Sequence, residues 1–95
     1  MIAEDEILER KALKFLLNKF YNESIEIVYE TSNGREIVDK ALELKPDIIL
    51  MDISMPIMNG LQAGNIIRSK CKDTEIIILT AFNYFEYSGF CVANF

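Results

Sequence analysis

The chain has 95 residues, enough for one domain at most, and its 51% apolar content lies far above that of disordered proteins. Ten basic residues against fifteen acidic ones give a net charge of −5. This balance excludes the basic stripe that a nucleic-acid-binding surface would need, and it is compatible with carboxylates clustered around a cation.

The same composition speaks against a zinc site and against a membrane protein. Cys71 and Cys91 have no histidine partner anywhere in the chain. Two free thiols in a reducing cytosol is the favoured interpretation, and a disulfide is the alternative. The opening segment "MIAEDEILERK" is too acidic for a signal peptide, and no apolar run approaches the ~18 residues of a membrane span. We therefore expect a cytoplasmic protein that does not contact membrane.

The first third of the chain predicts a short strand, a helix and a second strand. Only Met1-Ile2-Ala3 remains to form the strand that should precede the helix. From Ile7 to about Phe20, apolar residues at helical spacing predict an amphipathic helix lying on the core. The members of this apolar face are Leu8, Ala12, Phe15, Leu16 and Phe20. The alternating segment "IEIVYE" (Ile25–Glu30) predicts the second strand.

The rest of the chain predicts two more helices and two buried strands. "TSNG" (31–34) supplies turn and capping side chains for a helix that runs to about Leu44. "DIILMD" (47–52) and "TEIIILTA" (74–81) are continuous apolar runs, the pattern of strands covered on both faces. A Pro-Gly loop and a helix near 61–70 lie between them. This alternation predicts a parallel α/β sheet with right-handed crossovers.

Polar residues follow three of the expected strands, at the sheet edge where function gathers in such folds. "EDE" (4–6) follows the first strand, Asp52 ends the third, and Thr80-Ala81 ends the fourth. Taken singly, such an acidic pair is most simply a helix cap and such a threonine a turn residue. Carboxylates that converge from separate strands repel one another, so their coincidence indicates a hard cation, and oxygen ligands suit magnesium. Magnesium beside a carboxylate suggests phosphoryl chemistry.

These segments resemble the receiver domain of two-component response regulators. The resemblance rests on "EDE" after the first strand, "PDIILMDISMPIMNG" around the third and "IIILTAF" at the fourth, in that order. The central match is specific: Met-Pro stands at the third and fourth positions after Asp52, and Asn-Gly at the seventh and eighth. The match covers roughly residues 1–87. It implies a doubly wound, flavodoxin-like fold over one partial receiver domain, residues 1–95.

The resemblance also implies roles for individual residues. Asp52 resembles the phosphoacceptor, which takes a phosphoryl group from a phosphohistidine on a sensor histidine kinase. Asp5 resembles the carboxylate that binds Mg²⁺ directly together with Asp52, and Glu4 resembles its neighbour that acts through water. The backbone carbonyl of Ser54 corresponds to the third protein ligand, and Thr80 to the hydroxyl that engages the phosphoryl group and carries the switch.

The chain departs from the family at both ends. The first strand is shortened, and the fifth strand, its lysine, its aromatic switch residue and the last helix have no counterpart. The fourth strand would then be an apolar edge, an association hazard. Three arrangements could cover that edge: the apolar tail Phe90–Phe95, a second chain, or the rest of a longer product. The sequence therefore predicts a homodimer or a strand-exchanged oligomer.

Three functions remain open at this point. The first is a phosphorelay receiver that is not itself an enzyme and controls an output such as transcription through a DNA-binding domain, often of the AraC type, that this chain lacks. The second is a phosphorylation-independent interaction module with a remnant acidic pocket. The third, a hydrolase with an aspartyl-phosphate intermediate, is disfavoured because Ser54 stands where such enzymes carry a second aspartate.

Overall fold

The computed structural model describes residues 1–84 and 87–94 of the chain, with side chains through Leu79. The elements are β1 (Ile2–Ala3), α1 (Ile7–Tyr21), β2 (Glu30–Thr31), α2 (Gly34–Leu44), β3 (Ile48–Asp52), α3 (Gly60–Lys70), β4 (Glu75–Tyr84) and β5 (Tyr87–Asn94). They form one sheet in the order β2-β1-β3-β4-β5. The first four strands of that order are mutually parallel, which confirms the predicted flavodoxin-like arrangement.

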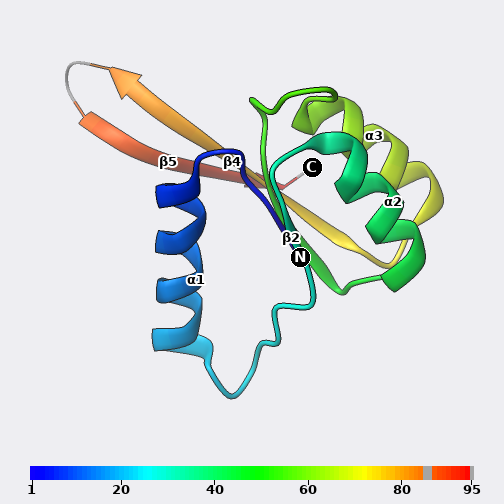
Figure 1. The fold of residues 1–95 in the computed structure, drawn as a ribbon, viewed down its shortest axis with the longest axis horizontal. Helices are drawn as coiled ribbons and strands as arrows, with labels where there is room; N and C mark the ends of the chain where they lie inside the picture. Colours follow the sequence, from blue (N-terminus) through cyan, green and yellow to red (C-terminus); the bar gives the residue numbers. More distant parts are fainter. Residues whose placement is uncertain (85–86, 95) are drawn as a thin grey trace.

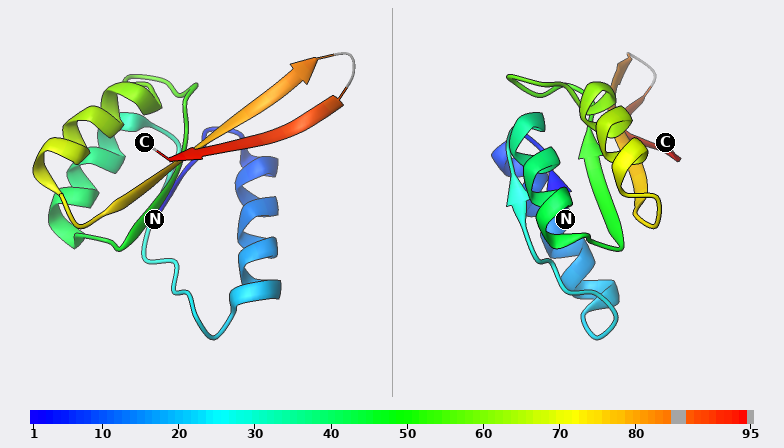
Figure 2. Two further views of the ribbon diagram at one scale, coloured as in Figure 1. Left: turned by 180° about the vertical axis from the view of Figure 1, so that it is seen from behind. Right: turned by 90° about the vertical axis from the view of Figure 1, so that its right-hand side faces the viewer.

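Helices α2 and α3 lie side by side on one face of the sheet, and α1 lies on the other (Figures 1 and 2). Helices α2 and α3 each begin after an asparagine whose side chain accepts a backbone N–H. Asn33 accepts from the Glu36 N–H at 2.8 Å, and Asn59 accepts from the Gln62 N–H at 2.9 Å. Helix α2 ends at Lys45, which adopts a left-handed conformation with φ of 47° just before Pro46. The segment 31–34 was predicted to cap α2, and Asn33 does so.

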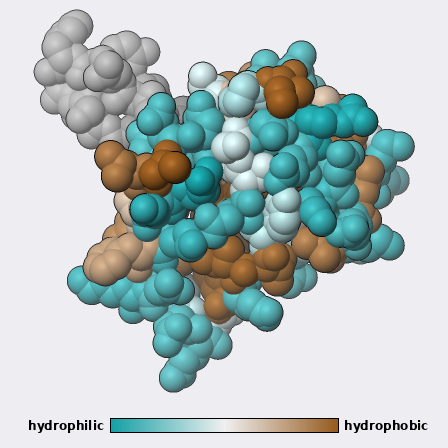
Figure 3. All heavy atoms as spheres, in the orientation of Figure 1, coloured by the Kyte–Doolittle hydropathy of each residue, from teal (hydrophilic) through white to brown (hydrophobic). Residues whose placement is uncertain are grey.

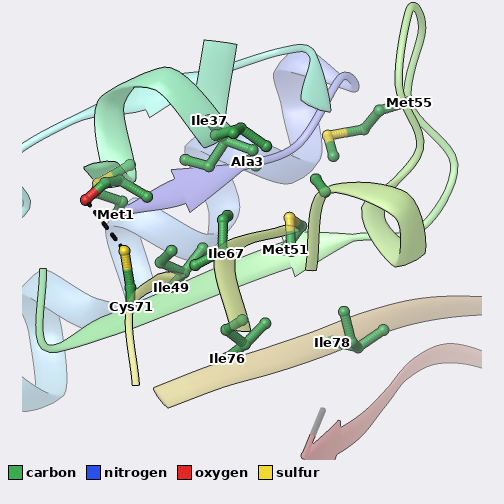
Figure 4. Packing of buried hydrophobic residues seen from close by; sticks show 13 residues of the cluster. Met1, Ala3, Ile37, Ile49, Met51, Met55, Ile67, Cys71, Ile76 and Ile78 are labelled. Atoms are coloured by element: carbon green, nitrogen blue, oxygen red, sulfur yellow. Dashed lines mark hydrogen bonds between the residues drawn. The ribbon is translucent and has the colours of Figure 1, made fainter. Parts of the chain in front are cut away.

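The hydrophobic core lies between α2, α3 and the sheet (Figure 4). Its fully buried members alternate along the strands, as Ile49 and Met51 do in β3 and Ile76 and Ile78 do in β4. Figure 4 shows these side chains facing Ile37 and Ile67 from the helices. Cys71 lies at the edge of this cluster as a free buried thiol, 3.8 Å from the carbonyl oxygen of Ala41, and Cys91 is outside the described side chains.

The second strand is shorter than predicted. Residues 25–29 of the expected strand have no regular structure, and β2 comprises Glu30 and Thr31 alone. A strand in a sheet extends only as far as its neighbour provides backbone partners, and β1 offers two residues, Ile2 and Ala3. Residues 25–29 have a strand-like sequence but no neighbouring strand with which to form backbone hydrogen bonds.

Strands β3 and β4 were expected to be covered on both faces; at the start of β3 one face is covered far better, whereas Leu79 at the other end of the described side chains of β4 is buried. Ile49 in β3 is fully buried, whereas Ile48 beside it is 44% exposed. The difference arises because α2 and α3 pack on one side while α1 stands away from the other (Figure 2).

Helix α1 has the predicted extent but is turned the opposite way. Within the described residues no side chain of α1 is buried, and Leu8, Phe15, Leu16 and Phe20 of the predicted core-facing side are exposed. The helix is held by its basic side: Arg10 Nε lies 3.3 Å and Lys14 Nζ 2.7 Å from the Glu30 carboxylate. The expectation that this apolar face lies on the core is wrong, since the basic side of α1 lies toward β2 and the apolar side lies outward.

The parallel fifth strand of the family is missing from the described residues, as predicted, and the tail of the chain forms a different strand beside β4. Strand β5 pairs antiparallel with β4, from Ile77 opposite Asn94 to Tyr84 opposite Tyr87. Of the three arrangements considered for the apolar edge of β4, the structure has the chain's own tail in that place. The strand differs from the parallel fifth strand of the family in direction.

No helix in the described part of the chain is long and apolar enough to cross a membrane.

Candidate functional site

Glu4 ends β1 and is fully buried, which is costly for a carboxylate. Its Oε2 accepts the backbone N–H of Glu6 at 3.0 Å. Its Oε1 has no hydrogen-bond partner. Among the described residues, it is the only buried side-chain oxygen or nitrogen without one. Burial raises the pKa of the Glu4 carboxyl to about 8, against the lowering effect of the Glu6 N–H. The residue is therefore held where a cation would satisfy it.

Asp52 ends β3, and its side chain is also buried. Burial raises the pKa of its carboxyl, and the Asp5 charge raises it further, whereas the neighbouring Glu4 carboxyl and the backbone N–H groups of Ser54 and Ile53 lower it. The position follows from topology, because β1 and β3 are parallel neighbours with Ala3 opposite Met51. Their next residues, Glu4 and Asp52, consequently leave the sheet at the same edge.

The three predicted carboxylates come together. One oxygen each from Glu4, Asp5 and Asp52 lie within 4.8 Å of one another, with Asp5 exposed and the other two buried. Three carboxylates at this separation repel strongly unless a cation or a proton is shared among them. An all-oxygen donor set with one side open to water fits Mg²⁺. The residues present therefore fit the predicted metal.

The loop after Asp52 is fixed by close backbone contacts. A Cβ at Gly60 would overlap the carbonyl of Asp52, and a Cβ at Gly34 would overlap the carbonyl of Met58. The Gly60 N–H donates to the Ile53 carbonyl at 2.7 Å, which ties the start of α3 to the end of β3. Gly60 belongs to the predicted Pro-Gly loop, and its role here is to let α3 begin against the backbone of the site.

Sequence reasoning missed two parts of this loop. Asn59 and Gln62 form a reciprocal capping box, since the Gln62 side chain also accepts the Asn59 N–H at 3.1 Å. The spacing of the two residues in "NGLQ" is the signal that could have revealed it. The close approach of Gly34 to Met58 carries no local signal, because it joins two distant loops.

The other predicted site residues are placed less completely. Asp52 is opposite Leu79 in the β3–β4 register, so the backbone of Thr80 continues β4 at the same edge. The Thr80 side chain is outside the described part of the structure. Ser54 is an exposed loop residue whose backbone N–H faces Asp52.

A basic partner for the acidic cluster is missing from the carboxyl-terminal part of the sequence. Residues 73–95 contain neither lysine nor arginine. The Arg10 guanidinium approaches Glu4, yet its Nη1 donates to the backbone carbonyl at 2.8 Å rather than to the carboxylate.

A sheet of this order with carboxylates at the ends of its first and third strands defines a class of signalling domain, and comparison with known proteins identifies the family. The sequence profile of the response regulator receiver domain matches residues 1–92, and the chain belongs to this family.

Relatives of known sequence and structure agree with this assignment. The chain is 46% identical over 83 residues to the transcriptional regulatory protein YdfI of Bacillus subtilis (strain 168), which covers 87% of the chain and 38% of YdfI. A DNA-binding response regulator of the LuxR family from Staphylococcus aureus has a TM-score of 0.77 at 34% identity, over 90% of this chain and 70% of that one.

A third neighbour is the CheX–CheY–BeF3–Mg complex from Borrelia burgdorferi, with a TM-score of 0.71 at 28% identity, over 90% of this chain and 63% of that one. The chain spans less than two-fifths of the length of YdfI.

Proposed function

We propose that this chain acts as a phosphorelay receiver in which Asp52 accepts a phosphoryl group from a phosphohistidine of a sensor histidine kinase. The observation that carries the proposal is the cluster of Glu4, Asp5 and Asp52, with the buried and unpartnered Oε1 of Glu4 among them. Burying such an oxygen costs free energy that stability alone does not explain.

Mg²⁺ would be the cofactor of this site, and Asp5, Asp52, Glu4 and the backbone carbonyl of Ser54 are the groups that would hold it. The fit of the carboxylates supports it, as does the Mg²⁺ in the related CheY complex. When bound, the ion screens negative charge so that an anionic oxygen can approach an anionic phosphoryl group.

Different residues of the chain have different roles in the phosphoryl transfer. The Asp52 carboxylate oxygen attacks phosphorus, the bond from phosphorus to the histidine nitrogen breaks, and its electron pair stays on the imidazole. Gly60 keeps α3 against the Asp52 backbone, so the carboxylate is held in place. The Thr80 hydroxyl binds a phosphoryl oxygen and reports the modification. Residues 1–95 act as one cytoplasmic receiver unit, whose phosphorylation controls transcription through a DNA-binding domain carried elsewhere.

The experiment is intact-mass measurement after incubation with acetyl phosphate and Mg²⁺. We expect an adduct of one phosphoryl group that is absent from the Asp52→Asn variant and from samples with excess chelator. Asp47→Asn is the matched control, because Asp47 is an exposed aspartate just before the other end of the same strand.

A second candidate function is a phosphorylation-independent interaction module. The observation that favours it is that the Arg10 guanidinium donates to the backbone carbonyl of Glu4 at 2.8 Å and not to the carboxylate. Failure to form the adduct at any Mg²⁺ concentration would reject the receiver proposal in favour of this one.

A further inference from the structure

The loop that joins β3 to α3 contains a strained turn close to the carboxylate cluster. Ile57 has a φ of 69°, in the left-handed region that a β-branched residue rarely adopts. The Met58 N–H donates to the Pro56 carbonyl at 2.7 Å, which closes a three-residue turn around Ile57. A turn of this kind with positive φ at its centre is the rare and strained form of the γ-turn. It persists only where neighbouring contacts fix the backbone.

The side chain of Ile57 does not supply those contacts. It is 82% exposed, and Figure 3 shows apolar atoms at the top of the molecule, where this loop projects. The residues on either side of the turn are better fixed, since Met55 is buried in the hydrophobic core and Met58 packs against that core. The turn is therefore held by its neighbours rather than by its central residue.

Gly34, the first residue of α2, provides one of these contacts. It is buried, and a Cβ at this position would overlap the carbonyl oxygen of Met58 and lie 2.7 Å from its carbonyl carbon. The φ of Gly34 lies outside the left-handed region, so the backbone conformation does not require glycine. Alanine would favour the helix more than glycine does. What glycine supplies here is space for the backbone of Met58.

The same loop carries backbone groups of the candidate site. The Ser54 N–H faces the Asp52 carboxyl, and the Ser54 carbonyl is one of the groups that would hold Mg²⁺. The base of the loop is tied, because the Gly60 N–H donates to the Ile53 carbonyl at 2.7 Å. Few residues lie between this tied base and Met58. A shift of the Met58 carbonyl must therefore change the backbone dihedral angles between them, those of Ser54 included.

We propose that Gly34 is a positioning residue of the metal site: the space at its Cα admits the Met58 carbonyl and so holds the strained loop with the Ser54 backbone at the carboxylate cluster. The inference rests on the proposed function, because it concerns the Mg²⁺ of the same site. Gly34 acts through the Met58 backbone and contacts neither the ion nor the phosphoryl group. Replacing a group that orients metal ligands typically costs about tenfold to a hundredfold in metal affinity.

The first test is calorimetric titration of the full 95-residue chain with Mg²⁺, under conditions where circular dichroism shows that each variant is folded. Gly34→Ala should raise the Mg²⁺ dissociation constant at least about tenfold. The matched control is Ala41→Gly, about 10 Å further along α2. It should lower the urea midpoint and leave the dissociation constant unchanged to within about twofold. Equal Mg²⁺ affinity of Gly34→Ala and the unchanged chain, or equal losses in the two variants, would overturn the proposal.

The second test reads the loop without metal, from the Ser54 amide resonance in excess chelator. Gly34→Ala should shift this resonance, and Ala41→Gly should leave it in place. This measurement separates the two proposals. If the unchanged chain binds no Mg²⁺, the proposed function is rejected, whereas a displaced Ser54 amide still supports the positioning contact. An undisturbed Ser54 amide in Gly34→Ala refutes the positioning role, whether or not the unchanged chain binds the ion.

The third test breaks the turn without changing Gly34. Ile57→Pro fixes φ at about −65°, so it should raise the Mg²⁺ dissociation constant as Gly34→Ala does. Ile57→Gly should retain the affinity to within about twofold, because glycine accepts a positive φ. The double variant Gly34→Ala with Ile57→Pro should bind no more weakly than the weaker single variant, because both changes act through one loop. Additive losses would show that Gly34 does not act through this turn.

Discussion

The helices on the two faces of the sheet are attached to it by different kinds of contact. On the α2/α3 face, alternate residues of β3 and β4 meet apolar residues of two capped helices, and Ile37, Ile49 and Ile67 are fully buried. On the α1 face, an equally apolar helix is held by Arg10 and Lys14 bound to Glu30, and its large apolar side chains are exposed. Stability and the position of the carboxylates therefore depend on the first face.

The sheet holds the buried carboxylate of Glu4 at the carboxyl ends of its strands. The free energy of unfolding should therefore depend on pH. The pKa of Glu4 is raised from 4.5 to about 8 in the fold, so the folded chain binds the proton more tightly than the unfolded chain. Stability is then fully present below pH 4.5 and is lost as pH rises toward 8. The total change is on the order of 4 kcal/mol, and the raised pKa of Asp52 acts in the same direction.

Urea unfolding between pH 5 and 9 in excess chelator measures this effect. Glu4→Gln should flatten the profile and be more stable than the unchanged chain at pH 9. Mg²⁺ added at pH 8 should restore stability to the unchanged chain and much less to the variant. A flat profile for the unchanged chain would contradict the assignment of the buried charge.

A matched pair of truncations contrasts the two faces. Ile67→Ala in α3 should cost about 3 kcal/mol in the free energy of unfolding, because it opens a cavity in a packed region. Leu16→Ala in α1 should cost less than about 0.5 kcal/mol, because its side chain is half exposed and alanine favours helix. Both are read from urea midpoints at a concentration where the chain is monomeric. Similar losses at the two positions would show that α1 packs on the sheet after all.

The ion pairs between α1 and Glu30 should make the smallest contribution to stability. Glu30→Gln removes the carboxylate that binds Arg10 and Lys14, and partly exposed pairs of this kind are worth about 0.5 kcal/mol. We expect that loss at low salt and almost none at high salt. Hydrogen exchange should accelerate in α1 and stay unchanged in α2, which separates release of the helix from global unfolding.

Most of the site was predictable from sequence because it depends on strand ends. Continuous apolar runs locate β3 and β4, and parallel topology then requires Glu4, Asp52 and the backbone of Thr80 to share one edge. The burial of Glu4 and its unpartnered oxygen could not be predicted, because both depend on what surrounds the residue. The same holds for Gly34 and Gly60, whose neighbours lie in other segments of the chain.

The failures of sequence reasoning all concern pairing partners. The segment 25–29 has a strand pattern, yet β1 offers too few backbone groups to extend β2. The tail has no counterpart in the expected fold, yet it forms β5 because the edge of β4 was open to pairing.

The sequence by itself determined the extent of the three helices, the parallel strands and the place of the acidic residues, because periodicity and strand ends are local properties. The tertiary structure alone decided which side of α1 faces outward, in which direction the last strand runs, and which carboxylate oxygen lacks a partner. Each of these features depends on contacts between segments that are distant in the sequence. A local sequence pattern does not specify which of those contacts form.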